Sequence, residues 1–285
     1  MSETLAQRIG AAHRSERPLV MGVVNVTPDS FSDGGRFDRP ERAVEHGLEL
    51  LQQGADMLDI GGESTRPGSE PVGAEEELAR VVPVITGLRA QTEAPISIDT
   101  TKPAVMRAAA AAGADMINDV CALTVPGALD AALECRLPVC LMHMQGRPRT
   151  MQNKPEYSDV VAEVLGFFQR RVQACLAAGL ARENLVLDPG FGFGKTLAHN
   201  LALLQRLREL NSLGYPLLVG VSRKSMLGAI TGRQIPDQRV AASVAAALLA
   251  AQRGAAIVRV HDVAETVDAL KVWQALAELE EKQGN

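Results

Sequence analysis

Eight short apolar runs, spaced evenly along the chain, each end in or lead directly into a polar residue or glycine. Consecutive runs are separated by stretches long enough for one helix each. The runs are Leu19–Val24 before Asn25, Met57–Ile60 before Gly61, Ile96–Ile98 before Asp99, Met116–Ile117 before Asn118, Val139–Met142 before His143, Leu185–Leu187 before Asp188, Leu217–Val221 before Ser222, and Ile257–Val260 before His261. Strand and helix alternating about eight times predict an α/β fold, the (β/α)8 TIM barrel. Catalytic side chains of such barrels lie at the carboxyl ends of the strands.

The length of the chain fits one barrel domain. It has 285 residues, of which 46% are hydrophobic, and a single barrel typically needs about 250. No linker or low-complexity tract interrupts the pattern, so we expect one catalytic domain over residues 18–285. Residues 1–17 are predicted to form an N-terminal tail, or a short strand that plugs the base of the barrel.

Charge and hydropathy exclude several classes of partner. A formal net charge of -5 argues against nucleic-acid binding, which usually needs a basic surface. The longest apolar stretch, Ala241–Ala251, is shorter than the roughly 18 residues of a membrane span. The N-terminus lacks the pattern of a signal peptide, and the four cysteines form no C-x-x-C pair. We therefore expect a cytoplasmic protein with reduced thiols and no membrane partner.

Two connections after strands are longer than barrel geometry requires. They span Asn25–Arg39 and Gly61–Gly73 and are rich in Gly, Ser, Asp and Pro. Long loops without secondary structure in a compact domain are usually functional. Because both follow strands directly, we predict two lid loops above the catalytic face, after strands one and two.

Three acceptor side chains end predicted strands. Asp99, Asn118 and Asp188 could each serve only to cap a helix or a loop, which is common for residues after strands. Three such groups in one barrel, however, converge on one cavity. Carboxylates and an amide suit the edge of a planar heterocycle that carries several N–H donors.

Cationic groups gather after the last two strands, where barrels commonly bind phosphate. Arg259 and His261 alternate on strand eight and point inward together, and Arg223 and Lys224 follow strand seven. We expect them to form an anion-binding corner away from Asp188. Two alternatives remain open: a buried ion pair of Arg259 with a neighbouring aspartate, and a purely hydrogen-bonded His261.

The glycine-rich segment 188–196 is similar in composition to a phosphate-binding loop but does not match the sequence pattern of one. Pro189 occupies the position where a Walker sequence requires glycine. Tight turns in this segment instead favour Phe191 or Phe193 as a cover over an aromatic ligand. His143 has no partner in the sequence pattern, and we interpret it as structural.

Two loop positions add to the anion corner. Thr65 and Arg66 supply a hydroxyl and a guanidinium that could reach an anion from the second lid. The side-chain carbonyl of Asn25 could take one coordination place on Mg²⁺, which needs few protein ligands when it is bound to a diphosphate.

Long motifs in the chain resemble those of the dihydropteroate synthase family. They are the segments 25–35, 61–68, 97–100, 117–120, 188–195, 222–225 and 259–262, and the resemblance runs in order from Leu19 to Trp273. It implies a sulfonamide-sensitive transferase of folate biosynthesis with Mg²⁺ as cofactor. The implied reaction joins (7,8-dihydropterin-6-yl)methyl diphosphate to 4-aminobenzoate, and releases pyrophosphate. The family is usually homodimeric.

The resemblance also implies roles for individual residues. The pterin is assigned to Asp99, Asn118, Asp188 and Lys224; the diphosphate to Asn25 with Mg²⁺, Thr65, Arg259 and His261; and the aminobenzoate to Arg66, Pro67, Phe193 and Ser222.

Two other functions share the pterin half of this pattern. One is a barrel methyltransferase that binds methyltetrahydrofolate, and the other is a pterin-binding paralogue without catalysis. The methyltransferase has no diphosphate to hold and needs neither the cation cluster nor the lids, whereas the paralogue should have lost one of them.

Overall fold

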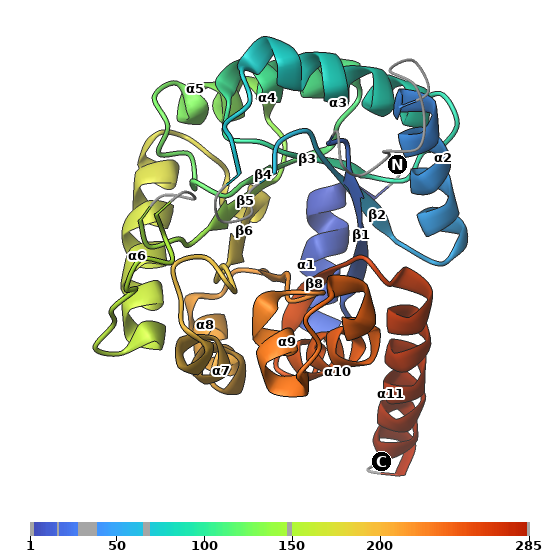
Figure 1. Ribbon diagram of the computed structural model, residues 1–285, viewed down its shortest axis with the longest axis vertical. Helices are drawn as coiled ribbons and strands as arrows, with labels where there is room; N and C mark the ends of the chain where they lie inside the picture. The colour runs from blue at the N-terminus through green and yellow to red at the C-terminus, as the bar shows by residue number, and fades with distance from the viewer. Residues whose placement is uncertain (1–2, 16, 28–38, 65–68, 147–149, 284–285) are drawn as a thin grey trace.

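The computed structural model describes residues 3–15, 17–27, 39–64, 69–146 and 150–283. Eight parallel strands close into a barrel in sequence order, which confirms the predicted fold (Figure 1). The strands are β1 (Leu19–Asn25), β2 (Met57–Gly61), β3 (Ile96–Asp99), β4 (Met116–Asp119), β5 (Val139–Met142), β6 (Leu185–Asp188), β7 (Leu217–Val219) and β8 (Ala255–Val260). Their bounds lie within two residues of the predicted apolar runs.

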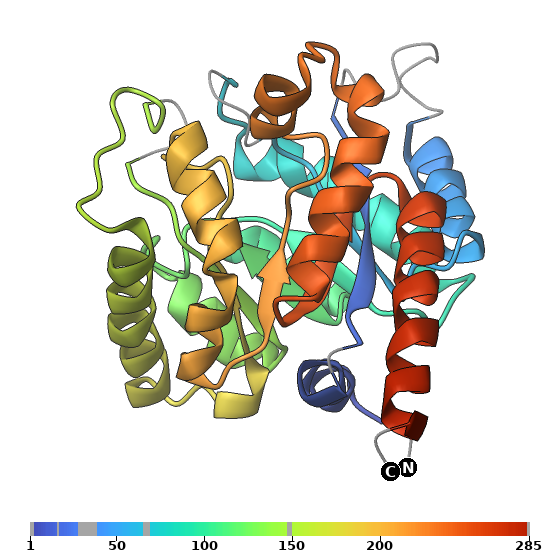
Figure 2. The ribbon, with the colours of Figure 1, turned by 90° about the horizontal axis from the view of Figure 1, so that it is seen from below.

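Helices cover the outside of the barrel (Figure 2). They are α1 (Leu5–Ser15), α2 (Arg39–Gln52), α3 (Ala74–Arg89), α4 (Pro103–Ala112), α5 (Ala128–Cys135), α6 (Val160–Ala177), α7 (Leu197–Gln205), α8 (Leu207–Leu210), α9 (Ser225–Thr231), α10 (Val240–Ala251) and α11 (Val263–Gln283). Local sequence explains their ends. In α4, for example, Pro103 stands in the first turn, and Gly113 ends the helix with a φ of 109°.

The two faces of each strand pack into separate cores. The outward face packs with the helices in one large apolar cluster. The inward face forms a second, smaller cluster at the bottom of the barrel, which consists of Met21, Met57, Met116, Cys140, Val186, Leu218 and Ile257 together with Ile9. Side chains alternate between faces along a strand, so residues two positions further on also point inward, nearer the catalytic face.

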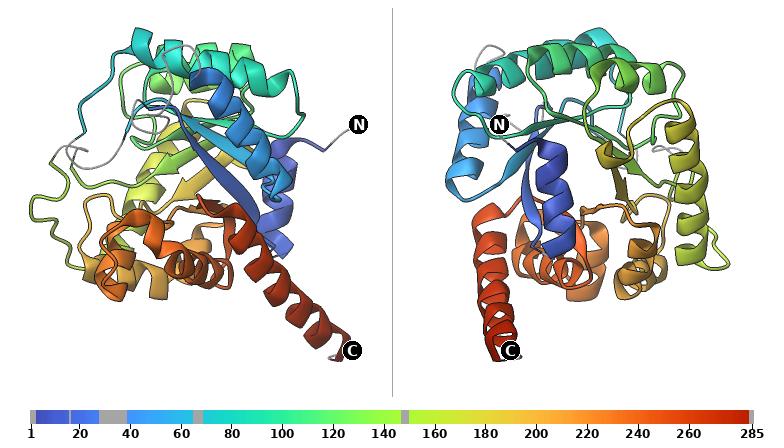
Figure 3. Two further views of the ribbon diagram at one scale, coloured as in Figure 1. Left: turned by 45° about the vertical axis from the view of Figure 1, so that its right-hand side comes forward. Right: turned by 180° about the vertical axis from the view of Figure 1, so that it is seen from behind.

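The N-terminal segment closes the bottom of the barrel as a helix. Helix α1 lies across one end of the barrel (Figure 3). Its Ile9, only 2% exposed, packs against the inward methionines. The segment that we expected to be a tail or a short strand is thus helical over residues 5–15. Residues 5–15 lack the alternation of a strand, and Leu5, Ile9 and Ala12 recur at helical spacing.

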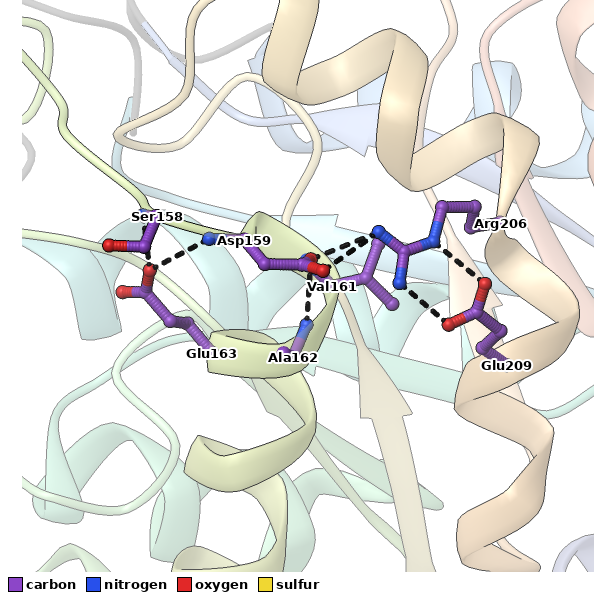
Figure 4. Close-up of polar contacts among 7 residues, drawn as sticks. All are labelled: Ser158, Asp159, Val161, Ala162, Glu163, Arg206 and Glu209. Atoms are coloured by element: carbon purple, nitrogen blue, oxygen red, sulfur yellow. Dashed lines mark hydrogen bonds and ion pairs between the residues drawn. The ribbon is translucent and has the colours of Figure 1, made fainter.

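A polar network fixes the start of α6 against α7 and α8. The Asp159 carboxylate accepts hydrogen bonds from the amides of Val161 and Ala162, which would otherwise be unpaired in the first turn (Figure 4). Arg206 then pairs with Asp159 at 3.0 Å and with Glu209 at 2.7 Å. This network links the segments that follow β5 and β6.

Two expectations about environment can be compared with the structure. Among the described residues, no helix combines the length and the apolar character needed to span a bilayer. The four cysteines are free, and Cys140 and Cys175 are buried, as the absence of paired spacing predicts.

Replacing Ile9 by alanine should destabilise the barrel by about 2–5 kcal/mol, because it opens a cavity beneath the inward methionines. Urea denaturation measures the change in the free energy of unfolding. Ile230→Ala is the control: its side chain is 54% exposed, and its loss should cost less than about 0.5 kcal/mol. Equal effects of the two substitutions would show that α1 does not close the barrel.

Candidate active site

A layer of charged and polar side chains lies directly above the apolar bottom of the barrel. Asp59, Asn118, Asp188 and Arg259 each stand two residues beyond a member of the inward cluster, on β2, β4, β6 and β8. The first three are less than 10% exposed. Burying charge in an apolar barrel is costly unless each group is paired or meets a ligand. This layer therefore marks the candidate active site.

The pairing of neighbouring strands brings four residues to the same level at the carboxyl end of the barrel. Across β1 to β4, the paired positions are Asn25, Gly61, Asp99 and Asn118. Gly61 has no side chain, and a Cβ placed there would lie 3.9 Å from both Asn25 Oδ1 and Asp99 Oδ2. Two oxygens thus border the space that Gly61 leaves open.

Arg259 bridges two aspartates inside the barrel. Its Nε donates to Asp59 Oδ2 at 2.6 Å, and its Nη2 donates to Asp99 Oδ2 at 3.1 Å. The buried ion pair left open by the sequence is confirmed. These partners on β2 and β3 place the guanidinium of Arg259 among the acids as well, while its role toward an anion stays a prediction.

Sequence reasoning missed Asp59, although a signal for it was present. Asp59 interrupts the apolar run 57–60 and stands in the middle of the strand, where it is fully buried. A charged residue inside an inward-facing strand needs a partner, and Arg259 on β8 has the same inward position.

The environment of Asp99 disfavours its charge. Burial, and then the nearby Asp59, raise the pKa of Asp99 to about 7, although Arg259 acts in the opposite direction. Asp99 therefore titrates near neutrality and is ionised above that pH. A ligand that donates hydrogen bonds would favour the ionised form.

Asp188 and Lys224 interact electrostatically at the carboxyl end of the barrel. Asp188 Oδ1 accepts a hydrogen bond from the amide of Gly190 at 2.7 Å, and burial raises its pKa. Burial also lowers the pKa of Lys224 to about 8, against the opposing effect of Asp188. Lys224 donates to the Phe191 carbonyl, and its ammonium lies 4.7 Å from the centre of the Phe193 ring.

The segment after β6 folds around a buried ammonium. Lys195 Nζ lies 3.0 Å from His143 Nδ1 and donates to the carbonyls of Gly190 at 2.9 Å and Phe193 at 3.0 Å. Burial lowers the pKa of His143 to about 3, so its neutral ring accepts the bond. His143 is structural, as predicted, and Lys195 is its partner.

Close backbone contacts explain the glycines in this segment. A Cβ on Gly190 would lie 1.9 Å from the His143 carbonyl oxygen, and one on Gly194 would lie 2.3 Å from that of Gln145. No other residue fits at either position. The segment holds Phe191 fully buried in the core and leaves Phe193 partly exposed beside Lys224, so only Phe193 can cover a ligand.

The end of β8 meets the loop after β7 through a serine and a histidine. Ser222 Oγ lies 3.0 Å from His261 Nδ1 and also accepts from the His261 amide at 3.2 Å. Arg223 turns away from them, with a φ of 58°, and pairs with Asp262 at 2.6 Å and with Asp237. Of the two basic residues in the segment directly after β7, Arg223 and Lys224, only Lys224 therefore belongs to the candidate site.

Most of the chain matches one known protein family. The family model described as pterin binding enzyme matches residues 21–261. The dihydropteroate synthase of Haemophilus influenzae is 54% identical over 260 residues, which cover 91% of this chain and 94% of the relative. The chain belongs to the dihydropteroate synthase family. It is accordingly an enzyme of the transferase class.

Solved structures of the family have the same fold. The Xanthomonas albilineans dihydropteroate synthase with 4-aminobenzoic acid superposes with a TM-score of 0.88 at 61% identity, and covers 92% of this chain and 93% of its own. The same enzyme in complex with 7,8-dihydropteroate superposes with a TM-score of 0.85 at 59% identity, and covers 92% and 94%.

A half-buried lysine anchors the second loop of this synthase fold. Lys102 Nζ donates to Glu63 Oε2 at 2.6 Å and to the fully buried Glu77, and Glu63 Oε1 accepts from the Val72 amide at 3.0 Å. These contacts close the neck of the loop from both sides. The assigned residues Thr65, Arg66 and Pro67, and the first loop over 28–38, lie outside the described residues.

The donor set fits the magnesium ion that the family implies. Asn25 Oδ1 borders the open space above Gly61, and an amide oxygen is a ligand that Mg²⁺ accepts. The described residues contain no group of three or more His, Cys, Asp or Glu side chains that could hold a metal alone. A magnesium ion here needs a ligand that supplies the remaining oxygens, as a diphosphate does.

Replacing Lys195 by methionine should lower the free energy of unfolding by about 1–3 kcal/mol, because buried carbonyls would lose their donor. Chemical denaturation checks this, and Lys271→Met, at an exposed position, serves as the control. If both variants matched the parent protein, the ammonium would not hold the segment after β6.

Proposed function

We propose that this enzyme condenses (7,8-dihydropterin-6-yl)methyl diphosphate with 4-aminobenzoate to give 7,8-dihydropteroate and pyrophosphate. The observation that carries the proposal is one pocket with three acceptors, Asp99, Asn118 and Asp188, beside the cations Lys224 and Arg259. The acceptors suit a heterocycle rich in N–H donors, and the cations suit a departing anion. Relatives with the same fold bind 4-aminobenzoic acid and 7,8-dihydropteroate.

The pterin is held through its amino-pyrimidine edge. Asp99, Asn118 and Asp188 accept hydrogen bonds from the ring N–H and the exocyclic amino group, which present donors side by side. Lys224 donates to a ring oxygen or nitrogen. Hydrogen bonds to ionised groups in a water-poor pocket are worth about 1.5–3 kcal/mol each, so this edge supplies most of the binding specificity.

The diphosphate is held beside the pterin, by Arg259 and His261 with Asn25 and Thr65. When bound there, Mg²⁺ would neutralise part of the charge on the leaving group. The guanidinium of Arg259 is fixed by two aspartates before the substrate arrives. Such preorganisation lowers the cost of stabilising charge as it develops.

The reaction is a substitution at the methylene carbon. The carbon–oxygen bond to the diphosphate breaks while negative charge builds on the leaving oxygens beside Arg259 and His261. The aniline nitrogen of 4-aminobenzoate forms the new carbon–nitrogen bond and loses one proton. Carboxylates under the pterin stabilise the positive charge that develops on the ring system and the methylene group.

The aminobenzoate lies against the outer part of the pocket. Phe193 offers the partly exposed aromatic face that a flat benzene ring would cover, and Ser222 offers a hydroxyl. Arg66 and Pro67 complete this site in the proposal, through the family resemblance alone. Sulfonamides, which share the shape of 4-aminobenzoate, are expected to compete there.

A homodimer is part of the same proposal. Helix α11 carries Val272, Leu276 and Leu279 at a spacing that places them on one face, and they are 66%, 57% and 52% exposed. This helix extends beyond the barrel (Figure 1). A large exposed apolar face is typical of an interface, and sedimentation velocity of the protein gives its oligomeric state.

Incubation with both substrates and Mg²⁺ tests the proposed reaction. We expect one pyrophosphate and one 7,8-dihydropteroate per turnover, measured by a coupled phosphate assay and by chromatography. Each single-substrate reaction is the control. Tight binding of a pterin without either product would instead identify a non-catalytic paralogue.

Asp188→Asn should weaken binding of 6-hydroxymethylpterin by about ten- to a hundredfold, because the carboxylate accepts a charge-assisted hydrogen bond. Isothermal titration calorimetry measures the dissociation constant. Asp119→Asn is the matched control: Asp119 is equally buried on β4, but it accepts the amides of Cys121 and Leu123. Unchanged affinity in Asp188→Asn would mean that the pterin binds elsewhere.

Pterin affinity should fall as the pH is lowered through about 7, the pKa to which burial and Asp59 raise Asp99. The protonated carboxyl, which predominates below that pH, loses acceptor strength, whereas the carboxylate above it is fully competent. Titrations from pH 5.5 to 8.5 with the same pterin check the direction. An affinity that rises on acidification would contradict the role of Asp99 as an ionised acceptor.

A further inference from the structure

Asp59 lies in the pocket floor between two residues of the proposed substrate site. Its Oδ2 accepts a hydrogen bond from Arg259 Nε at 2.6 Å and another from Asn118 Nδ2 at 3.1 Å. The side chain is fully buried on β2. One carboxylate oxygen therefore joins three strands, β2, β4 and β8.

The bond to Asn118 fixes which end of that amide faces the pocket. A carboxylate paired with a guanidinium accepts hydrogen bonds and cannot donate them. The end of Asn118 that faces Asp59 must then be its NH₂ group, and its carbonyl oxygen is the end left for a ligand. Without Asp59, the Asn118 amide could rotate by half a turn. Its NH₂ group would then face the N–H donors of the pterin, and no hydrogen bond could form.

The bond to Arg259 fixes the guanidinium in a similar way. Nε is committed to Asp59 and Nη2 to Asp99, which sets the plane of the group. The other oxygen, Asp59 Oδ1, has no hydrogen-bond partner within the described part of the chain although it is buried. Buried carboxylates with a purely structural role are normally saturated.

We propose that Asp59 is a positioning residue that sets the hydrogen-bond polarity of the pterin pocket. It holds Asn118 with its carbonyl toward the amino-pyrimidine edge and holds Arg259 across the floor. The inference rests on the proposed function, since it concerns the same ligand. It assigns Asp59 a role in orientation that is separate from its charge.

Two substitutions at position 59 separate orientation from charge. Asp59→Ala removes the acceptor for Asn118 and Arg259. Asp59→Asn removes the charge, but its amide oxygen can take the place of Oδ2 and accept both bonds. Isothermal titration calorimetry with 6-hydroxymethylpterin is the measurement, and Asp119→Asn is the control for loss of a buried carboxylate on the adjoining part of the barrel.

We expect Asp59→Ala to bind the pterin at least about tenfold more weakly, whereas Asp59→Asn and Asp119→Asn stay within about threefold of the parent protein. An Asp59→Ala protein with unchanged affinity would overturn the inference. An Asp59→Asn protein as weak as Asp59→Ala would also overturn it, because the charge would then matter and the orientation would not.

A variant at the other end of the bond gives a test that keeps Asp59. Asn118→Asp retains an acceptor for the ligand but cannot donate to Asp59, so we expect a loss of at least about tenfold. Parent-like affinity in Asn118→Asp would contradict the positioning role. Failure of the parent protein itself to bind the pterin would overturn the proposed function, and this inference with it.

Discussion

The bridge of Arg259 between Asp59 and Asp99 is the constraint on which the catalytic end of this barrel depends. Two carboxylates and one guanidinium lie inside a ring of apolar strands. Removing Arg259 would leave both buried carboxylates without a counter-charge, and breaking a buried pair in this way typically costs about 3–5 kcal/mol. A hydrophobic core of similar volume would be at least as stable. The charges are therefore better explained by the ligand that meets them than by the stability of the fold.

Three lysine side chains hold the loops around this bridge in place through hydrogen bonds and ion pairs. Lys195 gathers the segment after β6, Lys224 joins that segment to the pocket, and Lys102 anchors the neck of the second loop to Glu77. Lys195 and Lys224 each link a segment to the one that follows the preceding strand, and Lys102 links the second loop to α3. The position of Phe193 thus depends on Lys195, which donates to its carbonyl, and on Lys224 beside its ring.

Periodicity in the sequence was sufficient for the barrel and for most of its catalytic face. The strand ends at Asp99, Asn118 and Asp188 were predicted because the carboxyl ends of barrel strands meet at one face. Helix α1 was missed although Leu5, Ile9 and Ala12 recur at helical spacing, because an eleven-residue helix is marginal by itself and is stabilised by packing against the barrel. The environment of Arg259 could not be derived, since the residue lies 200 positions from Asp59 and strand pairing alone brings them together. The role of Lys195 could not be derived either, because its partners are backbone carbonyl groups, which leave no trace in a sequence, and His143, which lies 52 positions away.

We propose above all that Asp99, Asn118 and Asp188 recognise a pterin by accepting hydrogen bonds from its amino-pyrimidine edge. The most direct measurement compares the affinity of the enzyme for 6-hydroxymethylpterin with that for the 2,4-dioxo analogue, in which a carbonyl replaces the amino group. A carbonyl would face Asp188 or Asp99 with an acceptor, so the pterin should bind at least about tenfold more tightly. Equal affinities for the two compounds would contradict the account.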